Sequence, residues 1–344
     1  MGHVAAGVAT SFRPDDVRLA MGALSASLGV GHRIRRRRFN SADLALDCAG
    51  KVSVVTGASS GLGLAAARGL AERGATVILV SRDAARAEAA RLEVERVGRG
   101  RVHTELADLS SLSSVRSLAA RIAGRFEAIS VLLHNAGVVC DGFSRSEEGV
   151  ETTFATNTLG PFLLTALLLP QLARAAPARV VHVSSTLMFG QRLDVEAFLN
   201  PDARDYTPLR AYMASKRAQA ALSEVWAHRL AASGITSNCM LPGVAWTPGA
   251  ARAFPRLVRL SAPLLRTADE GADTMIWLSV ARAVERETGK LWFDRQALPA
   301  HAVPWTRGAE GDARRLFEAC EALTNVSERA SQRIPEQCSK QRRY

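Results

Sequence analysis

A tyrosine and a lysine placed four residues apart are the residues of this chain best suited to chemistry. Tyr212 and Lys216 stand in the run Tyr-Met-Ala-Ser-Lys, and on a helix this spacing brings both side chains to one face. A free phenol has a pKa of about 10, and a neighbouring positive charge lowers it. The pair can then exchange a proton with an alcohol or carbonyl oxygen, which Ser185 would polarise by a hydrogen bond. Taken alone, the pair also fits an ordinary helix surface.

The context that favours chemistry is a glycine-rich turn between a strand and a helix. A β-branched run, Val52–Val55, predicts a buried parallel strand, and the spacing Gly-x-x-x-Gly-x-Gly follows it before a helical pattern begins. Such a turn lets backbone N–H groups and the positive end of the helix dipole bind a pyrophosphate, although a purely structural turn is the alternative. The candidate ligands are Gly57, Ser59, Ser60, Gly61, Leu62 and Gly63.

The end of the predicted second strand indicates which dinucleotide binds. NAD-binding sites usually place an acid there to hydrogen-bond the ribose 2′-hydroxyl. This chain has Ser81 at that point and then Arg82, whose charge and planar donors suit a 2′-phosphate. The sequence therefore favours NADP(H). NAD(H) is the alternative, because Asp83 could bind the ribose and Arg82 could be one more surface arginine.

Two further strand ends carry polar or small residues, where ligands bind in a doubly wound sheet. After the third strand, Asp108 precedes Leu109 and could accept a hydrogen bond from the adenine amino group. After the fourth strand, the small residues of Asn135-Ala136-Gly137 let the backbone pass close to a ribose. Either feature alone could equally be an Asx turn.

Residues 50–295 resemble the short-chain dehydrogenase/reductase family. The resemblance is carried by five motifs in a fixed order: Thr-Gly-x-x-x-Gly-x-Gly, Asn-Ala-Gly, Asn-x-x-Gly, Ser and Tyr-x-x-x-Lys. The resemblance implies a fourth catalytic residue, Asn157, which positions a water in a proton relay from the lysine. It also implies that the Pro-Gly segment after the sixth strand contacts the nicotinamide amide and the phosphates. The residues of that segment carried over from the family are Pro242, Gly243, Val244 and Thr247.

The Ser-Arg-Asp end of the second strand is similar to the Cys-Arg-Asp of the retinol-dehydrogenase-like, NADP-using branch. Motifs within 215–219, 246–249, 270–278 and 293–295 resemble one subgroup more closely. Two positions depart from the pattern: His134 replaces an asparagine before Asn-Ala-Gly, and Leu241 replaces a histidine before Pro-Gly. The second change alters the floor near the nicotinamide and weakens any transfer of a retinoid preference.

Strand and helix patterns alternate along residues 50–300 with short connections. This βαβα order predicts an α/β fold, a single doubly wound Rossmann domain with a parallel seven-stranded sheet and helices on both faces. We divide the chain into a basic extension at 1–49, flexible or targeting, the dinucleotide-binding domain at 50–300, and a C-terminal extension at 301–344. The last part has one predicted helix and a polar tail. The helices predicted at 150–174 and 211–232 could form a dimer face, by analogy with the family only.

The net charge of +11 resides largely in the two ends of the chain. Residues 1–50 hold seven arginines against four aspartates, and residues 329–344 hold five basic residues against one glutamate. This distribution argues against a nucleic-acid groove on the folded body. Five cysteines lie far apart and the histidines lack ligand spacing, so we expect neither a disulfide framework nor a metal site.

The location of the protein has two interpretations. The acid-poor, Arg-rich start resembles an organelle-targeting or membrane-surface segment, but Asp15 and Asp16 and the lack of a hydrophobic face favour a disordered flank and a cytoplasmic protein. No run of about eighteen apolar residues predicts a membrane span. The loop at 243–267 is apolar, and it could bind a lipophilic substrate, touch a membrane or form a dimer contact. Its apolar residues are Trp246, Phe254, Leu257, Val258, Leu260 and Leu264.

These observations favour an NADP(H)-dependent oxidoreductase that acts on a carbonyl or alcohol, with a lipid, steroid or retinoid as the substrate class. A protein that binds the cofactor without turnover, as a regulator or scaffold, is the main alternative, although it would need neither Tyr212 nor Lys216. A nucleotide-sugar epimerase or dehydratase fits less well, because its glycine spacing is generally Gly-x-x-Gly-x-x-Gly.

Overall fold

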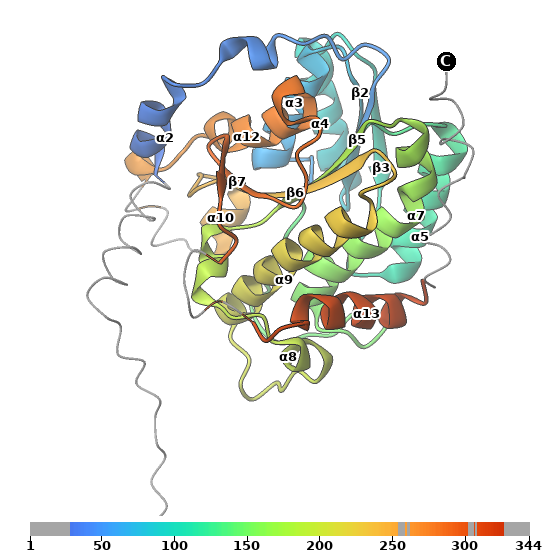
Figure 1. The fold of residues 1–344 in the computed structure, drawn as a ribbon, viewed down its shortest axis with the longest axis vertical. Helices are drawn as coiled ribbons and strands as arrows, with labels where there is room; N and C mark the ends of the chain where they lie inside the picture. The colour runs from blue at the N-terminus through green and yellow to red at the C-terminus, as the bar shows by residue number, and fades with distance from the viewer. Residues whose placement is uncertain (1–27, 254–258, 260–261, 302–305, 307, 327–344) are drawn as a thin grey trace, which may run out of the picture.

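The sheet is built from aliphatic and β-branched runs that lie side by side in the order β3-β2-β1-β4-β5-β6-β7-β8 (Figure 1). The computed structural model describes residues 28–253, 259, 262–301, 306 and 308–326. All neighbouring strands are parallel except the last pair. The strands are β1 (Val52–Thr56), β2 (Thr76–Ser81), β3 (Val102–Leu106), β4 (Val131–His134), β5 (Ala178–Val183), β6 (Ile235–Leu241), β7 (Leu291–Phe293) and β8 (Gln296–Leu298).

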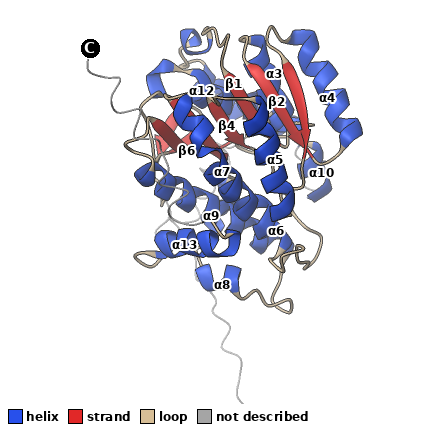
Figure 2. Ribbon diagram, turned by 90° about the vertical axis from the view of Figure 1, so that its right-hand side faces the viewer, coloured by secondary structure: helices blue, strands red, loops and turns tan. Residues whose placement is uncertain are grey.

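Two layers of helices cover this sheet, as its buried central strands require (Figure 2). One apolar core lies under α3 (Gly61–Glu72), α4 (Ala84–Val97) and α12 (Ala268–Val280). The other core lies under α5 (Leu112–Arg125), α7 (Gly160–Arg174) and α9 (Pro208–Arg229). The Rossmann-like α/β prediction is therefore confirmed. Shorter helices are α8 (Val195–Leu199), α10 (Pro248–Ala253) and the 3₁₀ turns η3 (Thr186–Gly190), η4 (Ala262–Leu264) and η5 (Arg282–Val284).

The sheet has eight strands where the sequence predicted seven. β7 and β8 form a hairpin joined by only two residues, Asp294 and Arg295. Both adopt positive φ values, 48° and 60°, which is the conformation of a tight type I′ turn. The sequence lacks the glycine that usually marks such a turn. The additional strand was therefore missed.

The helix predicted at 150–174 is interrupted. It begins as α6 (Thr152–Phe154), continues as a π-helix, η2 (Ala155–Leu159), and only then becomes α7. Thr152–Arg174 as a whole is long and apolar enough to cross a membrane by length and composition. Most of it is buried inside the domain, as expected of a core helix.

Residues 28–49 of the N-terminal extension pack on the domain, where the sequence favoured a disordered flank. Helix α2 (Gly29–Arg36) and the turn η1 (Ser41–Leu44) lie against the domain (Figure 1). The indole N–H of Trp277 on α12 donates to Asp43, 2.8 Å away. The flank was misjudged because its partners lie more than 200 residues further along the chain. Residues 1–27, which include the rest of the predicted targeting segment, lie outside the described residues.

The predicted C-terminal helix is α13 (Asp312–Thr324), and it is part of the domain core (Figure 1). Its Phe317 is fully buried and packs edge-to-face on Phe162 of α7 and Trp226 of α9, with ring centroids 4.9 and 4.8 Å away. Helix α13 therefore completes the apolar layer under α7 and α9. The polar tail after residue 326 lies outside the described residues.

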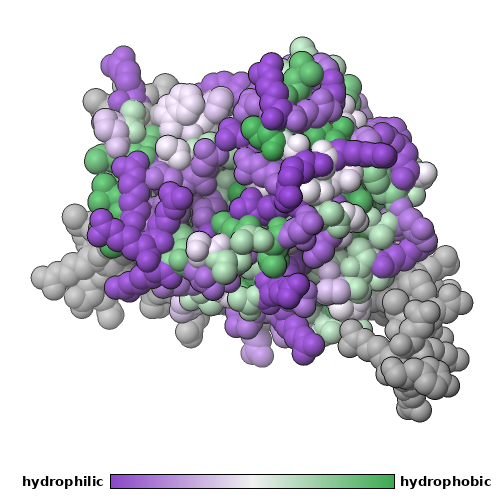
Figure 3. Space-filling view, turned by 90° about the horizontal axis from the view of Figure 1, so that it is seen from above, coloured by the Kyte–Doolittle hydropathy of each residue, from purple (hydrophilic) through white to green (hydrophobic). Residues whose placement is uncertain are grey.

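One face of the molecule shows how these helices meet solvent. Among the residues drawn in colour, hydrophilic side chains cover much of the surface and apolar side chains form smaller patches between them (Figure 3). This is the pattern of helices that direct one side to the core and the other to water.

We expect Phe317→Ala to lower the free energy of unfolding by about 3–5 kcal/mol, because it removes a buried ring between two aromatic neighbours. Urea unfolding followed by circular dichroism measures this change. Leu106→Ala is the control, because Leu106 is 47% exposed and its loss should cost about 0.5 kcal/mol or less. Equal effects of the two substitutions would show that α13 is not part of the cooperative core.

Candidate active site

Tyr212 and Lys216 lie on the first half of α9, which begins with Pro208 at a position where its fixed φ suits a helix start. The Lys216 ammonium lies 5.7 Å from the centre of the Tyr212 ring. The lysine is only 2% exposed, whereas the tyrosine is half-buried. The structure thus brings the predicted pair together, with the cation inside and the phenol nearer the surface.

The Lys216 ammonium is held by two oxygen acceptors. It donates to the carbonyl oxygen of Val183 at the end of β5 and to the side-chain carbonyl of Gln219, each at 2.9 Å. Burial lowers the pKa of Lys216 to about 8. The lysine therefore carries its charge at neutral pH and loses it in mildly alkaline solution.

The pKa of the Tyr212 phenol is raised, where the sequence analysis expected a neighbouring positive charge to lower it. Burial raises its pKa, and a side-chain hydrogen bond with Ser185 offsets part of that rise. The Lys216 ammonium donates to Val183 and Gln219, and the net effect of the surroundings is a Tyr212 pKa above its ordinary value. Tyr212 therefore keeps its proton at neutral pH and can serve as an acid.

Two serines follow β5, and the structure distinguishes them. Ser184 is buried, and its hydroxyl donates to the backbone carbonyl of Lys216 at 2.8 Å, so it fastens β5 to α9. Ser185 is half-buried, and its hydroxyl lies near enough to the Tyr212 phenol to lower the pKa of that phenol. Ser185, the residue predicted from the sequence, thus lies beside the phenol.

Asn157 lies within the π-helix η2, and such bulges are frequent at functional sites. Its side-chain oxygen accepts from the Val138 N–H at 2.8 Å. Its amide donates to the Val138 carbonyl and the Ser215 hydroxyl, both at 3.0 Å. A Cβ on Gly137 would lie 3.1 Å from the Lys216 ammonium and 3.5 Å from the Asn157 oxygen. Glycine at this position therefore lets Lys216 and Asn157 face the same small space.

The backbone of the glycine turn lies directly against the backbone at the end of β4. Gly57 has a φ of 66°, and a Cβ on it would lie 2.8 Å from the Cα of Ala136. A Cβ on Gly63 would overlap the Asn135 amide. The Thr56 hydroxyl accepts from the backbone N–H groups of Asn135 and Ala136, each at 3.1 Å.

The Pro-Gly segment closes the other side of the turn. A Cβ on Gly61 would lie 3.1 Å from the Thr247 methyl group. Gly243 has a φ of 72°, which turns the chain after Pro242. The carbonyl of Val244 accepts from the Arg266 N–H at 3.0 Å. The segment thus lies beside the glycine turn and is paired with Arg266.

The start of α3 fits an anionic group. Ser60 stands at the N-cap but makes no capping hydrogen bond, so the first N–H groups of the helix remain available. The Ser60 hydroxyl accepts instead from the Arg86 guanidinium at 3.0 Å. Together with the space that glycines leave in the turn, these donors fit the phosphates of a nicotinamide dinucleotide.

The remaining predicted ligands have local roles as well. Arg82 is exposed, and the Asp83 carboxylate accepts the Arg86 N–H as the N-cap of α4. Asp108 accepts the backbone N–H and the hydroxyl of Ser110, which is an Asx turn. Leu62 directs its side chain toward α12, so only its backbone faces the turn. Ser59 is half-buried, and Leu109 is buried against α7.

Three residues of the site were missing from the predicted set: Thr56, Arg86 and Gln219. Thr56 and Gln219 occur within motifs used for the resemblance, but neither had been given a role. Arg86 lies one turn into α4, four residues after Arg82, and nothing in the sequence distinguishes it from other surface arginines.

Within the described part of the chain, no group of three or more His, Cys, Asp or Glu is placed to hold a metal ion. The cysteines in the described ranges, Cys48, Cys140, Cys239 and Cys320, are free thiols.

Comparison with known proteins is consistent with this geometry. Residues 51–197 match the family model described as short chain dehydrogenase. The chain is 34% identical to dehydrogenase/reductase SDR family member 12 of Bos taurus, over 85% of this chain and 92% of that protein. It is 36% identical to retinol dehydrogenase 12 of Bos taurus, over 71% and 78% of the two chains.

Solved structures resemble the fold. A crystal structure of an uncharacterized protein from Mycobacterium paratuberculosis has a TM-score of 0.65 and 32% identity, over 83% of this chain and 97% of that one. A short chain dehydrogenase from Shigella flexneri, complexed with NADP, has a TM-score of 0.58 and 27% identity, over 74% and 99%.

We expect Gln219→Leu to shift the alkaline limit of carbonyl reduction to lower pH. The Lys216 ammonium would lose a hydrogen-bond acceptor, so its charged form would become less favourable and its pKa would fall further, by about one unit. The measurement is kcat/KM against pH between neutral and alkaline solution.

Ser223→Ala is the matched control, because Ser223 lies further along α9 and bonds Ser237 at 3.1 Å. Its pH profile should coincide with that of the wild type. An unchanged profile in Gln219→Leu would contradict the role given to this acceptor.

Proposed function

Because the chain belongs to the short-chain dehydrogenase/reductase family of oxidoreductases, we propose that it transfers hydride between NADP(H) and a lipophilic carbonyl or alcohol. The observation that carries this proposal is the grouping of Tyr212, Ser185 and a buried Lys216 at the carboxyl end of β5. Asn157 lies within the same group. A binding protein without turnover would need none of these proton-transfer groups.

The nicotinamide supplies or accepts the hydride when it is bound. In reduction, the protonated Tyr212 phenol donates its proton to the substrate oxygen, and Ser185 donates a hydrogen bond to the same oxygen. The Lys216 ammonium stabilises the phenolate that remains. Asn157 and Lys216 flank the space over Gly137, where a relay water would restore the proton to Tyr212.

The glycine turn, the ends of β3 and β4 and the segment after β6 would hold the dinucleotide. Arg82 supports the choice of NADP(H), because it follows the end of β2, where an acid usually binds the ribose of NAD, and its charge suits a 2′-phosphate. Arg86 adds a second guanidinium beside Ser60. The N-cap role of Asp83 weakens the NAD(H) alternative.

A lipophilic substrate is supported by exposed apolar side chains near the Pro-Gly segment. Trp246 is 51% exposed and Leu264 48% exposed. The other apolar residues predicted to line this loop lie outside the described residues: Phe254, Leu257, Val258 and Leu260. Peripheral membrane contact and a homodimer interface are the other uses proposed for this surface.

For the location of the protein we propose the cytoplasm. Imaging of full-length and residue-50-truncated forms would reveal organelle targeting.

Tyr212→Phe should reduce kcat/KM by about 10²–10⁴-fold while leaving NADPH affinity nearly unchanged, because only the acidic proton is lost. Turnover is followed by NADPH absorbance against a panel of aldehydes and ketones, with long-chain and small hydrophilic members. Affinity is measured by fluorescence titration.

The result for the wild type separates the alternatives. Wild-type protein that binds NADPH but turns over no member of the panel would favour the regulatory or scaffolding protein. Faster turnover of small hydrophilic carbonyls would contradict the lipophilic substrate class.

Arg82→Ala should weaken NADPH binding by about 10- to 150-fold and leave NADH binding within about twofold, because a charge-assisted contact to the 2′-phosphate contributes about 1.5–3 kcal/mol. The two dissociation constants are compared in the same titration. Arg91→Ala is the control, since Arg91 lies on α4 and pairs with Glu88 and Glu95. An unchanged NADPH/NADH ratio in Arg82→Ala would remove the assignment of NADP.

A further inference from the structure

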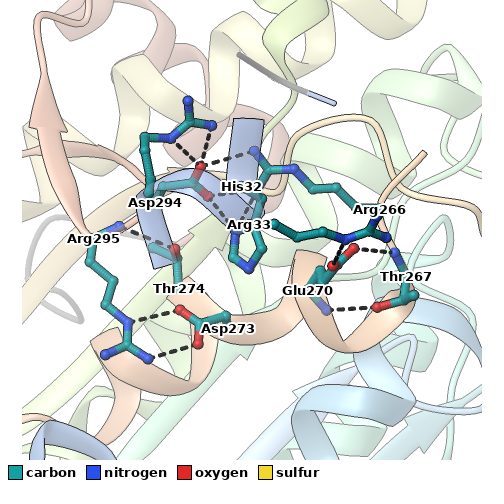
Figure 4. Close-up of polar contacts among 10 residues, drawn as sticks. His32, Arg33, Arg266, Thr267, Glu270, Asp273, Thr274, Asp294 and Arg295 are labelled. Atoms are coloured by element: carbon teal, nitrogen blue, oxygen red, sulfur yellow. Dashed lines mark hydrogen bonds and ion pairs between the residues drawn. The ribbon is translucent and has the colours of Figure 1, made fainter. Parts of the chain in front are cut away.

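A buried carboxylate joins three segments that are far apart in the sequence (Figure 4). Asp294, in the β7–β8 turn, is 1% exposed. The Arg266 guanidinium donates to both of its oxygens, at 2.6 and 3.0 Å. From helix α2, Arg35 donates to it at 2.7 Å and the His32 ring lies 3.1 Å away.

These partners keep the carboxylate charged. Burial acts to raise the pKa of Asp294, but the contacts with His32, Arg266 and Arg35 hold it well below its usual range. A buried charge that loses one partner is strongly destabilised. The position of Asp294 and Arg266 therefore depends on helix α2 remaining in place.

The backbone of Arg266 also connects helix α2 and Asp294 to the Pro-Gly segment. Its N–H donates to the Val244 carbonyl at 3.0 Å, and its carbonyl accepts from the Trp246 N–H at 2.9 Å. These two bonds form the short parallel bridge between residues 245 and 266. The residue that fixes Asp294 thus also fixes the stretch next to Thr247 and the glycine turn.

Helix α2 has further contacts with the same region. Gly29 lies so close to Leu265 that a Cβ on it would be 2.9 Å from the Leu265 carbonyl oxygen. Arg33 donates to Glu270 at 2.8 Å, and Glu270 forms the capping box of α12 with Thr267. A cavity of about 570 Å³ lies between this region and the start of α3, lined by Gly61, Trp246 and Arg266 among others.

We propose that helix α2 and Asp294 position the segment Val244–Thr247, and that helix α2 thereby sets the affinity for the nicotinamide dinucleotide. The identity of the ligand in this inference rests on the proposed function. The link between helix α2 and Val244–Thr247 rests on the contacts of Asp294 and Arg266. Asp294 is a positioning residue, because it acts through Arg266. Helix α2 is thus a structural part of the proposed cofactor site.

The test replaces Arg35 by Gln, which removes one cation from Asp294 at a position 23% exposed to solvent. Arg35→Lys is the conservative variant, because it keeps the charge. Asp273→Asn is the matched control, since Asp273 on α12 pairs at 2.7 Å with Arg295, the other residue of the same hairpin turn. NADPH binding is measured by fluorescence titration, and backbone exchange by deuterium labelling without nucleotide.

Arg35→Gln should raise the dissociation constant for NADPH on the order of tenfold, the usual size of a coupling between sites. The value of kcat at saturating NADPH should stay within about twofold, and the amides of Trp246 and Arg266 should exchange faster. Arg35→Lys should restore most of the affinity, and Asp273→Asn should behave as the wild type.

Unchanged affinity and unchanged exchange at Trp246 and Arg266 in Arg35→Gln would overturn the inference, as would an equal loss of affinity in Asp273→Asn. Absence of NADPH binding by the wild type would overturn the proposed function and the affinity claim together. The exchange measurement needs no nucleotide, so it decides the coupling by itself in that case.

Discussion

The buried ammonium of Lys216 is the constraint on which the rest of the site depends. A charge in the interior needs acceptors, and here the end of β5 supplies the Val183 carbonyl and α9 supplies Gln219. These contacts place α9 against the carboxyl end of the sheet, and Tyr212 is carried with it. The glycine at position 137 is the consequence on the opposite side, because any side chain there would meet the ammonium.

Much of this arrangement was predictable, because it follows from local rules. The bounds of strands β3, β5 and β6 and of helix α4 are set locally, since β-branched runs and an Asp cap determine them within a few residues. Glycine spacing and the order of strand ends then bring Gly57, Asn135 and Tyr212 to one edge of the sheet. Topology alone thus accounts for most of the candidate site.

The parts that escaped prediction depend on partners distant in sequence or on irregular backbone. Asn157 is presented by a π-helix, which no periodicity in the residues reveals. Helix α2 contacts the domain through His32 and Asp294, which are 262 residues apart in the sequence. The preference of Tyr212 for its protonated form reflects burial, which the spacing of Tyr212 and Lys216 does not report.

The ion cluster around Asp294 also differs in kind from the apolar packing of α13 on α7 and α9. Apolar residues of similar volume often stabilise a core as well as buried ion pairs do, so stability alone does not explain such a cluster. The two-oxygen contact of Arg266 with Asp294 also fixes the orientation of both side chains. A planar guanidinium can donate to both carboxylate oxygens only over a narrow range of angles. A segment that must meet a nucleotide within a fraction of an ångström benefits from that fixed orientation. The charges in α2 are therefore better explained by the geometry they impose on Val244–Thr247 than by the stability they contribute.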